Sequence, residues 1–175
     1  MSRHTIKKEK MERVKYISNV LPEKLILEIK NYAIQNSKKA VWNTNKLLWA
    51  EPIVKDSGSV DILNLKQSSL EDKILFYFKK YKKYKCIGLN YNRWYPGSFI
   101  PFHNDQIFKL ASTVYLNENW DRDYGGLFLY EYKNELKAIV PKYNHAVINS
   151  NSVVHGTSIV SPRAPIRETL QLFFE

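Results

Sequence analysis

Apolar residues recur at helical spacing in the first half of the chain. Between Pro22 and Ser37 they fall at positions 25, 26, 29 and 33, which form one face of a helix, and proline suits a first helical turn. A second helix is expected to begin at Ser69, because Ser69 followed by Asp72 resembles a capping box. One face of that helix is then marked by Leu70, Ile74, Phe78 and Tyr81. The pattern therefore predicts two amphipathic helices before residue 86.

From residue 86 onward the pattern changes to short segments rich in Tyr, Phe, Val, Ile and Thr, separated by turn residues. The expected strands are 86–95, 99–104, 110–117, 126–132, 136–140, 145–149, 157–160 and 167–174. Two helices followed by about eight short strands indicate an α+β fold, in which helices buttress a β-sandwich or barrel. We find no repeat or linker, and 175 residues suit one domain. We expect residues 1–85 to supply helical support and a basic arm, and residues 86–175 to form the β core.

Composition indicates the class of protein and the compartment in which it works. Hydrophobic residues make up 44% and charged residues 25% of the chain, as in soluble globular proteins. The single cysteine, Cys86, excludes an internal disulfide and favours a reducing compartment, and its apolar surroundings predict a packed core thiol. The sequence contains no apolar stretch of membrane-spanning length and no secretory signal pattern at its N-terminus. We therefore expect a cytoplasmic protein with no membrane contact.

The net charge of +10 is concentrated in two runs. One extends from Lys7 to Arg13, and the other comprises Lys79, Lys80, Lys82, Lys83 and Lys85, with two tyrosines interleaved. The favoured interpretation is a solvated helix face and a charged tail. Two alternatives remain open: binding of nucleic acid, and attraction of an acidic substrate.

Three residues have the pattern of a metal site. His103 and Asp105 are two residues apart, so they point to the same side of an extended strand. His155 follows fifty residues after Asp105, in a turn before an apolar strand. Two imidazoles and a carboxylate form the facial triad of non-heme iron(II) oxygenases, which leaves coordination positions open for a bidentate oxoacid and O2. Zinc accepts the same ligands, so the triad alone does not exclude a hydrolase.

The last strand supplies a candidate anion site. Alternation places Arg167, Thr169, Gln171 and Phe173 on one face of residues 167–174. An arginine inside a β-sandwich is costly unless it meets an anion, and its guanidinium can pair with a carboxylate through two hydrogen bonds. Arg167 with Thr169 can thus hold the distal carboxylate of 2-oxoglutarate. The alternatives are a surface Arg167, or Arg163 as the anchor, although Arg163 is in a predicted loop.

Taken in order, these segments resemble the prolyl-4-hydroxylase-like branch of the 2-oxoglutarate/Fe(II) oxygenases. The resemblance covers residues 86–174 and rests on matching segments at 95–105, 114–120, 124–127, 140–144 and 155–157, and on Arg167 with its strand. It implies a double-stranded β-helix of jelly-roll or cupin-like form, with the metal inside one end. It also implies Fe(II) and 2-oxoglutarate as cofactors, O2 as co-substrate, succinate and CO2 as co-products, and hydroxylation of a C–H bond. Ascorbate is a further candidate ligand.

The chain departs from this family at one oxoacid-binding position. Family members often carry a tyrosine on the strand that matches 110–117, where Val114 stands here. Tyr91, Tyr95 or Tyr115 can substitute, and we expect Tyr95 because it directly precedes the strand with the metal ligands.

Several functions remain open. The leading hypothesis is hydroxylation of a prolyl residue in a protein, or of a free amino acid or other small molecule. A nucleic-acid dealkylating oxygenase is less favoured, since the enzymes of that kind carry a second arginine where Phe173 stands. A non-catalytic cupin-like binding module and a zinc hydrolase are weaker alternatives. Substrate specificity is expected from the loops at 42–66 and 121–124, and the oligomeric state is left open.

Overall fold

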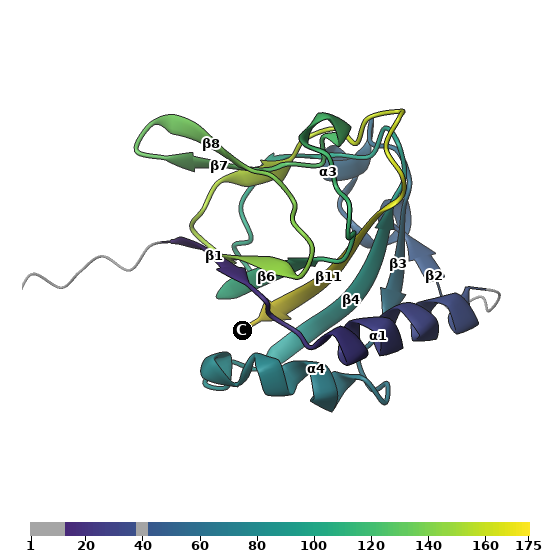
Figure 1. The fold of residues 1–175 in the computed structure, drawn as a ribbon. Coiled ribbons are helices and arrows are strands. Elements are labelled where there is room, and N and C mark those ends of the chain that lie inside the picture. Colours follow the sequence, from purple (N-terminus) through teal and green to yellow (C-terminus); the bar gives the residue numbers. More distant parts are fainter. Residues whose placement is uncertain (1–12, 38–41) are drawn as a thin grey trace, which may run out of the picture.

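The computed structural model describes residues 13–37 and 42–175 (Figure 1). The predicted basic run from Lys7 to Arg13 lies outside the described residues except for Arg13.

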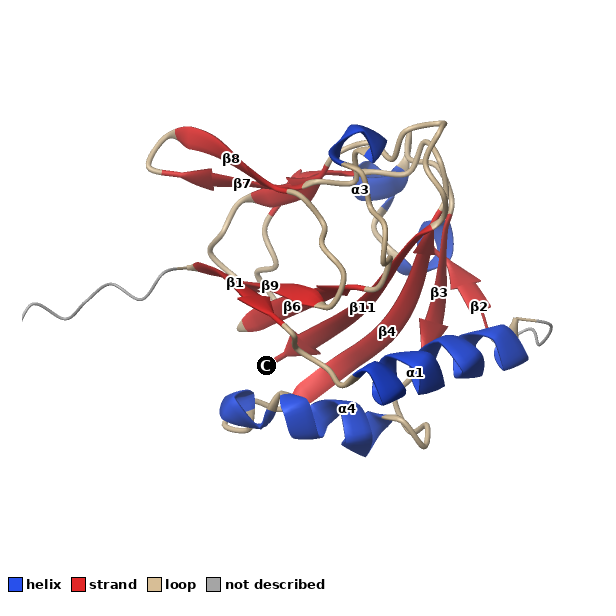
Figure 2. Cartoon of the chain, in the orientation of Figure 1, coloured by secondary structure: helices blue, strands red, loops and turns tan. Residues whose placement is uncertain are grey.

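Two antiparallel sheets face one another, with the main helices on the outer side of the larger sheet (Figure 2). The seven-stranded sheet has the order β1-β9-β6-β11-β4-β3-β2, and the four-stranded sheet has the order β5-β10-β7-β8. The strands are β1 Val14–Ser18, β2 Trp42–Thr44, β3 Val60–Asn64, β4 Cys86–Trp94, β5 Ile100–His103, β6 Leu110–Tyr115, β7 Phe128–Tyr132, β8 Glu135–Ile139, β9 His145–Ser150, β10 His155–Thr157 and β11 Arg167–Phe174. This arrangement confirms the predicted α+β jelly roll.

Four α-helices and two short 3-10 helices connect these strands within the described residues. They are α1 Glu23–Asn36, α2 Asn45–Leu48, α3 Glu51–Val54, α4 Glu71–Tyr77, η1 Lys79–Tyr81 and η2 Arg122–Tyr124. The predicted apolar face of α1 is buried, and it packs in one core with α4 and the outward side chains of the larger sheet. None of these helices has the length and apolar character needed to cross a membrane.

Alternation along β11 separates this core from the interior between the sheets. Leu170 and Leu172 are buried in the core that contains the helices. Arg167 and Gln171 point the other way and line the cavity between the sheets. The pairing of β11 with β4 on one side and β6 on the other fixes which residues face that cavity together.

The segment before residue 86 differs from the sequence expectation, because it contributes strands as well as helices. β1, β2 and β3 extend the larger sheet on both sides. They are three to five residues long, and their pattern alternates over too few positions to be distinguished from loop in the sequence.

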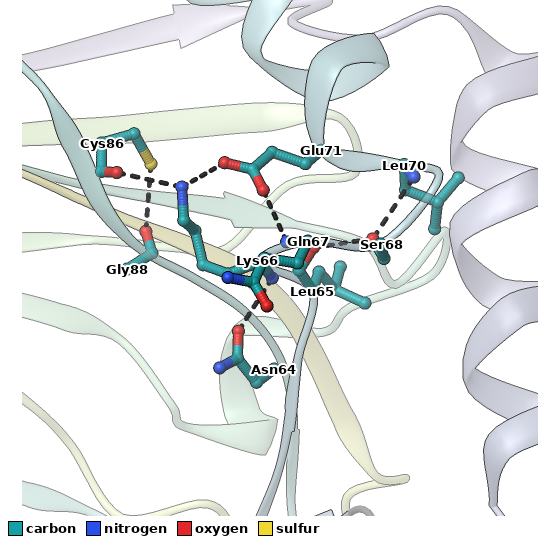
Figure 3. Close-up of polar contacts among 9 residues, drawn as sticks. All are labelled: Asn64, Leu65, Lys66, Gln67, Ser68, Leu70, Glu71, Cys86 and Gly88. Atoms are coloured by element: carbon teal, nitrogen blue, oxygen red, sulfur yellow. Dashed lines mark hydrogen bonds and ion pairs between the residues drawn. The ribbon is translucent and has the colours of Figure 1, made fainter.

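The predicted capping box at Ser69 is wrong. α4 begins at Glu71 without a side-chain cap, and the preceding turn is held by Glu71 itself (Figure 3). One carboxylate oxygen of Glu71 accepts a hydrogen bond from the backbone of Gln67 at 2.6 Å, and the other pairs with the Lys66 ammonium. Lys66 also donates to the carbonyl of Cys86 at 3.1 Å, which ties the start of α4 to β4. Cys86 itself is buried, as expected.

The second basic run occupies η1 and the turn after it. All five of its lysines are exposed, as both a solvated face and a binding surface require. Tyr81 and Tyr84 are only partly exposed and pack against the core that contains α1 and α4.

Candidate active site

His103, Asp105 and His155 lie together at one end of the space between the sheets. His103 ends β5, Asp105 follows two residues later, and His155 begins β10, which pairs with β5 so that the two histidines are opposite one another. The candidate ligand atoms of the three side chains all lie within 4.8 Å of one another. Nε2 of His103 is 3.6 Å from one oxygen of Asp105, and Nε2 of His155 is 3.5 Å from the other. The strand that begins at His155 was predicted to begin two residues later, at 157.

Backbone carbonyls orient both imidazoles. Nδ1 of His103 lies 2.9 Å from the carbonyl oxygen of Pro101, and Nδ1 of His155 lies 2.9 Å from that of Val153. A carbonyl oxygen only accepts a hydrogen bond, so each Nδ1 carries the proton and each Nε2 presents a lone pair toward the other ligands. Phe128 stacks on His155 with ring centroids 5.3 Å apart, which further fixes that ring.

The three side chains influence one another's protonation. Burial opposes protonation of His103, but the Asp105 carboxylate and the Pro101 carbonyl together outweigh burial, so the pKa of His103 is raised. Burial lowers the pKa of His155. Burial also disfavours the Asp105 carboxylate, yet the neighbouring histidines hold the pKa of Asp105 below its ordinary value. Asp105 is therefore held as a carboxylate and His155 as a neutral imidazole. These are the protonation states that bind a metal.

Arg167 lies in the same cavity with an unusual environment for a cation. Its side chain is 2% exposed. Nε and one terminal nitrogen of the guanidinium are buried without a hydrogen-bond partner. Burial lowers the pKa of Arg167 to about 10, so it remains a cation at neutral pH. A buried guanidinium with unpaired donors is the expected signature of a site for an anion.

Two aromatic rings hold the guanidinium in place. Its Cζ atom lies 5.0 Å from the ring centroid of Trp94 and 5.3 Å from that of Tyr115. The Tyr115 hydroxyl is also buried without a partner, and burial raises its pKa. Gly126 closes the remaining side: a Cβ atom there would lie 2.7 Å from Cδ of Arg167. The cluster thus offers unpaired guanidinium and phenol donors in one buried place.

The hydroxyls of the two other residues expected to contact the oxoacid already have hydrogen-bond partners within the protein. The hydroxyl of Tyr95 donates to Asp61 at 2.8 Å, so it already has a partner within the protein. The hydroxyl of Thr169 accepts a hydrogen bond from Nε1 of Trp94 at 3.0 Å, so it positions the ring beside Arg167. The structure brings Tyr115 to Arg167 instead of Tyr95. The cause is strand register: Tyr115 pairs with Thr169 and faces inward, whereas Val114 faces the helical core.

A cavity of about 640 Å³ connects the metal cluster with Arg167. The metal-binding side chains and Arg167 all line it. A row of neutral polar residues crosses its floor on adjacent strands, since Gln171 pairs with Asn90 on β4 and with Thr113 on β6. Aliphatic and aromatic side chains form much of the remaining wall: Leu48, Trp49, Ile53, Ile87, Ile107, Phe108 and Phe173.

The residues present fit both groups that the sequence implies. Two imidazoles and a carboxylate with converging ligand atoms suit an iron(II) ion that keeps open positions. The orphaned donors of Arg167, which lines the same cavity, and of Tyr115 beside it suit a carboxylate at a second point.

Comparison with solved structures identifies the fold. A prolyl-4-hydroxylase from Pseudomonas putida is similar with a TM-score of 0.73 over 93% of this chain and 92% of its own, at 17% sequence identity. A prolyl hydroxylase from Trichoplax adhaerens, solved with a hypoxia-inducible-factor peptide, has a TM-score of 0.69 over 94% and 84% of the two chains, at 16% identity. The α-ketoglutarate-dependent epimerase SnoN from nogalamycin biosynthesis has a TM-score of 0.71 over 93% and 78%, at 9% identity.

These likenesses show that the chain has the fold found in iron(II)/2-oxoglutarate oxygenases. The prolyl hydroxylases share this fold, as the resemblance of residues 86–174 predicted. Models of protein families and curated protein sequences were also searched, and neither comparison found a match. An epimerase is among the proteins that share this fold. The fold alone therefore does not define the reaction, which has to be inferred from the site.

Proposed function

We propose that the protein is an Fe(II)- and 2-oxoglutarate-dependent oxygenase that hydroxylates a C–H bond of a prolyl residue within a polypeptide. One observation carries this proposal. A three-ligand metal cluster and a buried arginine with unpaired donors line the same cavity. This arrangement suits 2-oxoglutarate, which can chelate the metal at one end while its distal carboxylate pairs with the arginine.

Each side chain has a defined task in this proposal. His103, Asp105 and His155 hold the metal, with the imidazole orientation set by the carbonyls of Pro101 and Val153. Arg167 and Tyr115 hold the distal carboxylate of 2-oxoglutarate. When bound, iron and the oxoacid supply the oxidising chemistry, while the protein supplies binding, orientation and a shielded pocket. Succinate and CO2 are the expected co-products, and ascorbate is included as a reductant on the strength of the family resemblance alone.

The charges that line the cavity favour a residue of a polypeptide over a free amino acid. Among the described residues that line it, only Asp105 and Arg167 carry a formal charge, apart from the two histidines. Both are assigned to the cofactors. A free amino acid brings an ammonium and a carboxylate, and burying these groups without partners is costly. A residue inside a chain brings amides, which the row of Asn90, Thr113 and Gln171 can hydrogen-bond.

Apolar side chains at the mouth of the cavity support the same choice. Leu48 is 52% exposed and Ile107 is 79% exposed, and both line the cavity. Exposed aliphatic side chains at a cavity mouth suit the flanking part of a polypeptide substrate. The Trichoplax adhaerens structure, in which a prolyl hydroxylase holds a peptide, is consistent with this substrate class.

Nucleic-acid dealkylation is the less favoured function. At the position where such enzymes carry a further arginine, Phe173 stacks with Phe108 at a centroid distance of 4.4 Å. The cavity then lacks a second cation, among its described lining residues, for a phosphate or an anionic intermediate.

Mass spectrometry tests the proposal. Protein loaded with Fe(II) is incubated with 2-oxoglutarate, ascorbate, O2 and a proline-containing peptide library, and peptides are screened for the gain of one oxygen atom. Omission of ascorbate shows whether it contributes, and a sample with chelated iron is the control. Oxygen gain in free amino acids or oligonucleotides but not in peptides would overturn the substrate class. No oxygen gain in any of them would count against the hydroxylase.

A further inference from the structure

Cationic side chains gather at one edge of the larger sheet. Lys85 precedes β4 and exchanges two backbone hydrogen bonds with Glu175, just beyond the end of β11. Lys109 precedes β6, and its backbone bonds to Phe174 and to Asn151 on the two flanking segments. Arg13 precedes β1 and accepts a backbone hydrogen bond from the end of β9. These contacts place Lys85, Lys109 and Arg13 on every second strand along one edge; the chain end labelled C in Figure 1 marks this place.

Further lysines enlarge this basic edge, which we define as Arg13, Lys15, Lys82, Lys83, Lys85 and Lys109. All six are exposed. Asp105 is the sole acidic residue between Asp72 and Glu118 in the sequence, and it belongs to the metal cluster. Glu175 lies 3.7 Å from Lys85, but both side chains are at least half exposed, and such a pair is worth little in water.

The basic edge borders the cavity. Ile87 and Gly88, which follow Lys85, line the cavity wall, and so does Phe108, which directly precedes Lys109. Lys109 is four positions after Asp105 in the sequence, a span of at most about 14 Å. A polypeptide that leaves the cavity across the Phe108–Phe173 pair therefore meets the basic edge within a few residues.

We propose that the basic edge binds an acidic segment of the polypeptide substrate, a few residues away from the residue that enters the cavity. This inference rests on the proposed function for the identity of the substrate. Cations on alternate strands are about 10 Å apart, twice the strand spacing. Three residues of an extended peptide also span about 10 Å. Acidic residues at every third position of an extended substrate would therefore match Lys85, Lys109 and Arg13.

The tyrosines of the basic run favour a polypeptide over single-stranded nucleic acid as the ligand. Binding of unpaired bases depends on exposed aromatic rings that can stack. Tyr81 packs on Phe174 with ring centroids 6.1 Å apart, and Tyr84 contacts the core. The ammonium groups of Lys80 and Lys83 lie over these two rings. The rings of Tyr81 and Tyr84 are thus already in contact with the core and with these two lysines, which leaves them less surface for stacking bases.

Fluorescence anisotropy with the full chain tests this inference without turnover. The probe is a labelled peptide with one proline, followed by glutamates at every third position, and the matched probe has glutamines instead. We expect the glutamate peptide to bind about fivefold more tightly at low salt, an advantage that shrinks as salt rises. The double variant Lys85→Gln/Lys109→Gln should lose this advantage. The control Lys24→Gln/Lys133→Gln removes the same charge from exposed positions on α1 and on the β7–β8 turn, and should keep it.

Three results would overturn the inference: equal affinity for both peptides, equal loss in both double variants, or tighter binding of a single-stranded oligonucleotide that displaces the peptide. Selective binding of the glutamate peptide without oxoglutarate turnover would support the docking edge while contradicting the proposed function. The two proposals therefore fail in different ways.

Discussion

The Cζ atom of Arg167 lies 5.3 Å from the ring centroid of Tyr115, and the phenol hydroxyl is buried without a hydrogen-bond partner, as are two guanidinium nitrogens. Unpaired buried donors of this kind cost free energy, so their retention side by side indicates that an anion joins them.

Replacement of Tyr115 by Phe removes one of these donors with little change in shape. We expect the Tyr115→Phe variant to raise the KM for 2-oxoglutarate about tenfold, the effect of losing one hydrogen bond to a charged group. Steady-state kinetics at saturating substrate measures this. Tyr95→Phe is the matched control and should leave this KM unchanged, because the Tyr95 hydroxyl bonds to Asp61. If Tyr95→Phe raised the KM for 2-oxoglutarate and Tyr115→Phe did not, Tyr95 would be the oxoacid ligand.

Gly126 offers a steric test of the Arg167 site. Its φ is +61°, and a Cβ atom would approach Nε of Arg167 to 2.9 Å. The Gly126→Ala variant should displace the guanidinium and raise the KM for 2-oxoglutarate at least about tenfold. Gly97→Ala provides the control, since Gly97 has a φ of +84° but nothing within 4 Å of the added atom.

Both alanine variants should lose about 1 kcal/mol of stability from the backbone conformation. Only Gly126→Ala should change the affinity for the oxoacid. Equal kinetics in the two variants would mean that Arg167 does not bind the oxoacid.

The lowered pKa of Glu71 predicts that the free energy of unfolding depends on pH. Its hydrogen bond to Lys66 holds the pKa of Glu71 below the ordinary value of 4.5. A depressed folded-state pKa contributes stability that is present above pH 4.5 and is lost as the pH falls through the folded-state pKa. We expect Glu71→Gln to lower stability by about 1 kcal/mol at neutral pH, and to differ less from the unmodified protein in acid.

Urea unfolding at neutral pH and below pH 4.5 measures this difference. Asp72→Asn is the comparison, because Asp72 is exposed in the same turn of α4. If the two variants showed the same pH dependence, the pairing of Glu71 with Lys66 would have no measurable role.

Several elements could be predicted from the sequence because one face of each is buried. The helix predicted over 22–37 and the strand predicted over 167–174 have apolar patterns that match the observed burial of α1 and β11. The metal residues and Arg167, chosen for their spacing and alternation, lie in one cavity.

The parts that could not be predicted depend on contacts between distant segments. Alternation allows either Val114 or Tyr115 to face inward, and the register of β6 against β11 makes the choice. Likewise, β3 is defined by its pairing with β4, which the short pattern of Val60–Asn64 does not reveal. The basic edge combines strand ends from β1, β4 and β6, so it exists only after the sheet has formed.

The central claim is that one cavity holds iron(II) and 2-oxoglutarate together, and succinate release tests it most directly. Protein reconstituted with Fe(II) or with Zn(II) is incubated with 2-oxoglutarate and O2, alongside the His155→Ala and Arg167→Leu variants and iron without protein. We predict succinate release above the protein-free rate for the Fe(II) protein alone, and none above that rate with Zn(II) or in either variant. Equal succinate release from the Fe(II) protein and from His155→Ala, or none from any sample, would contradict the account.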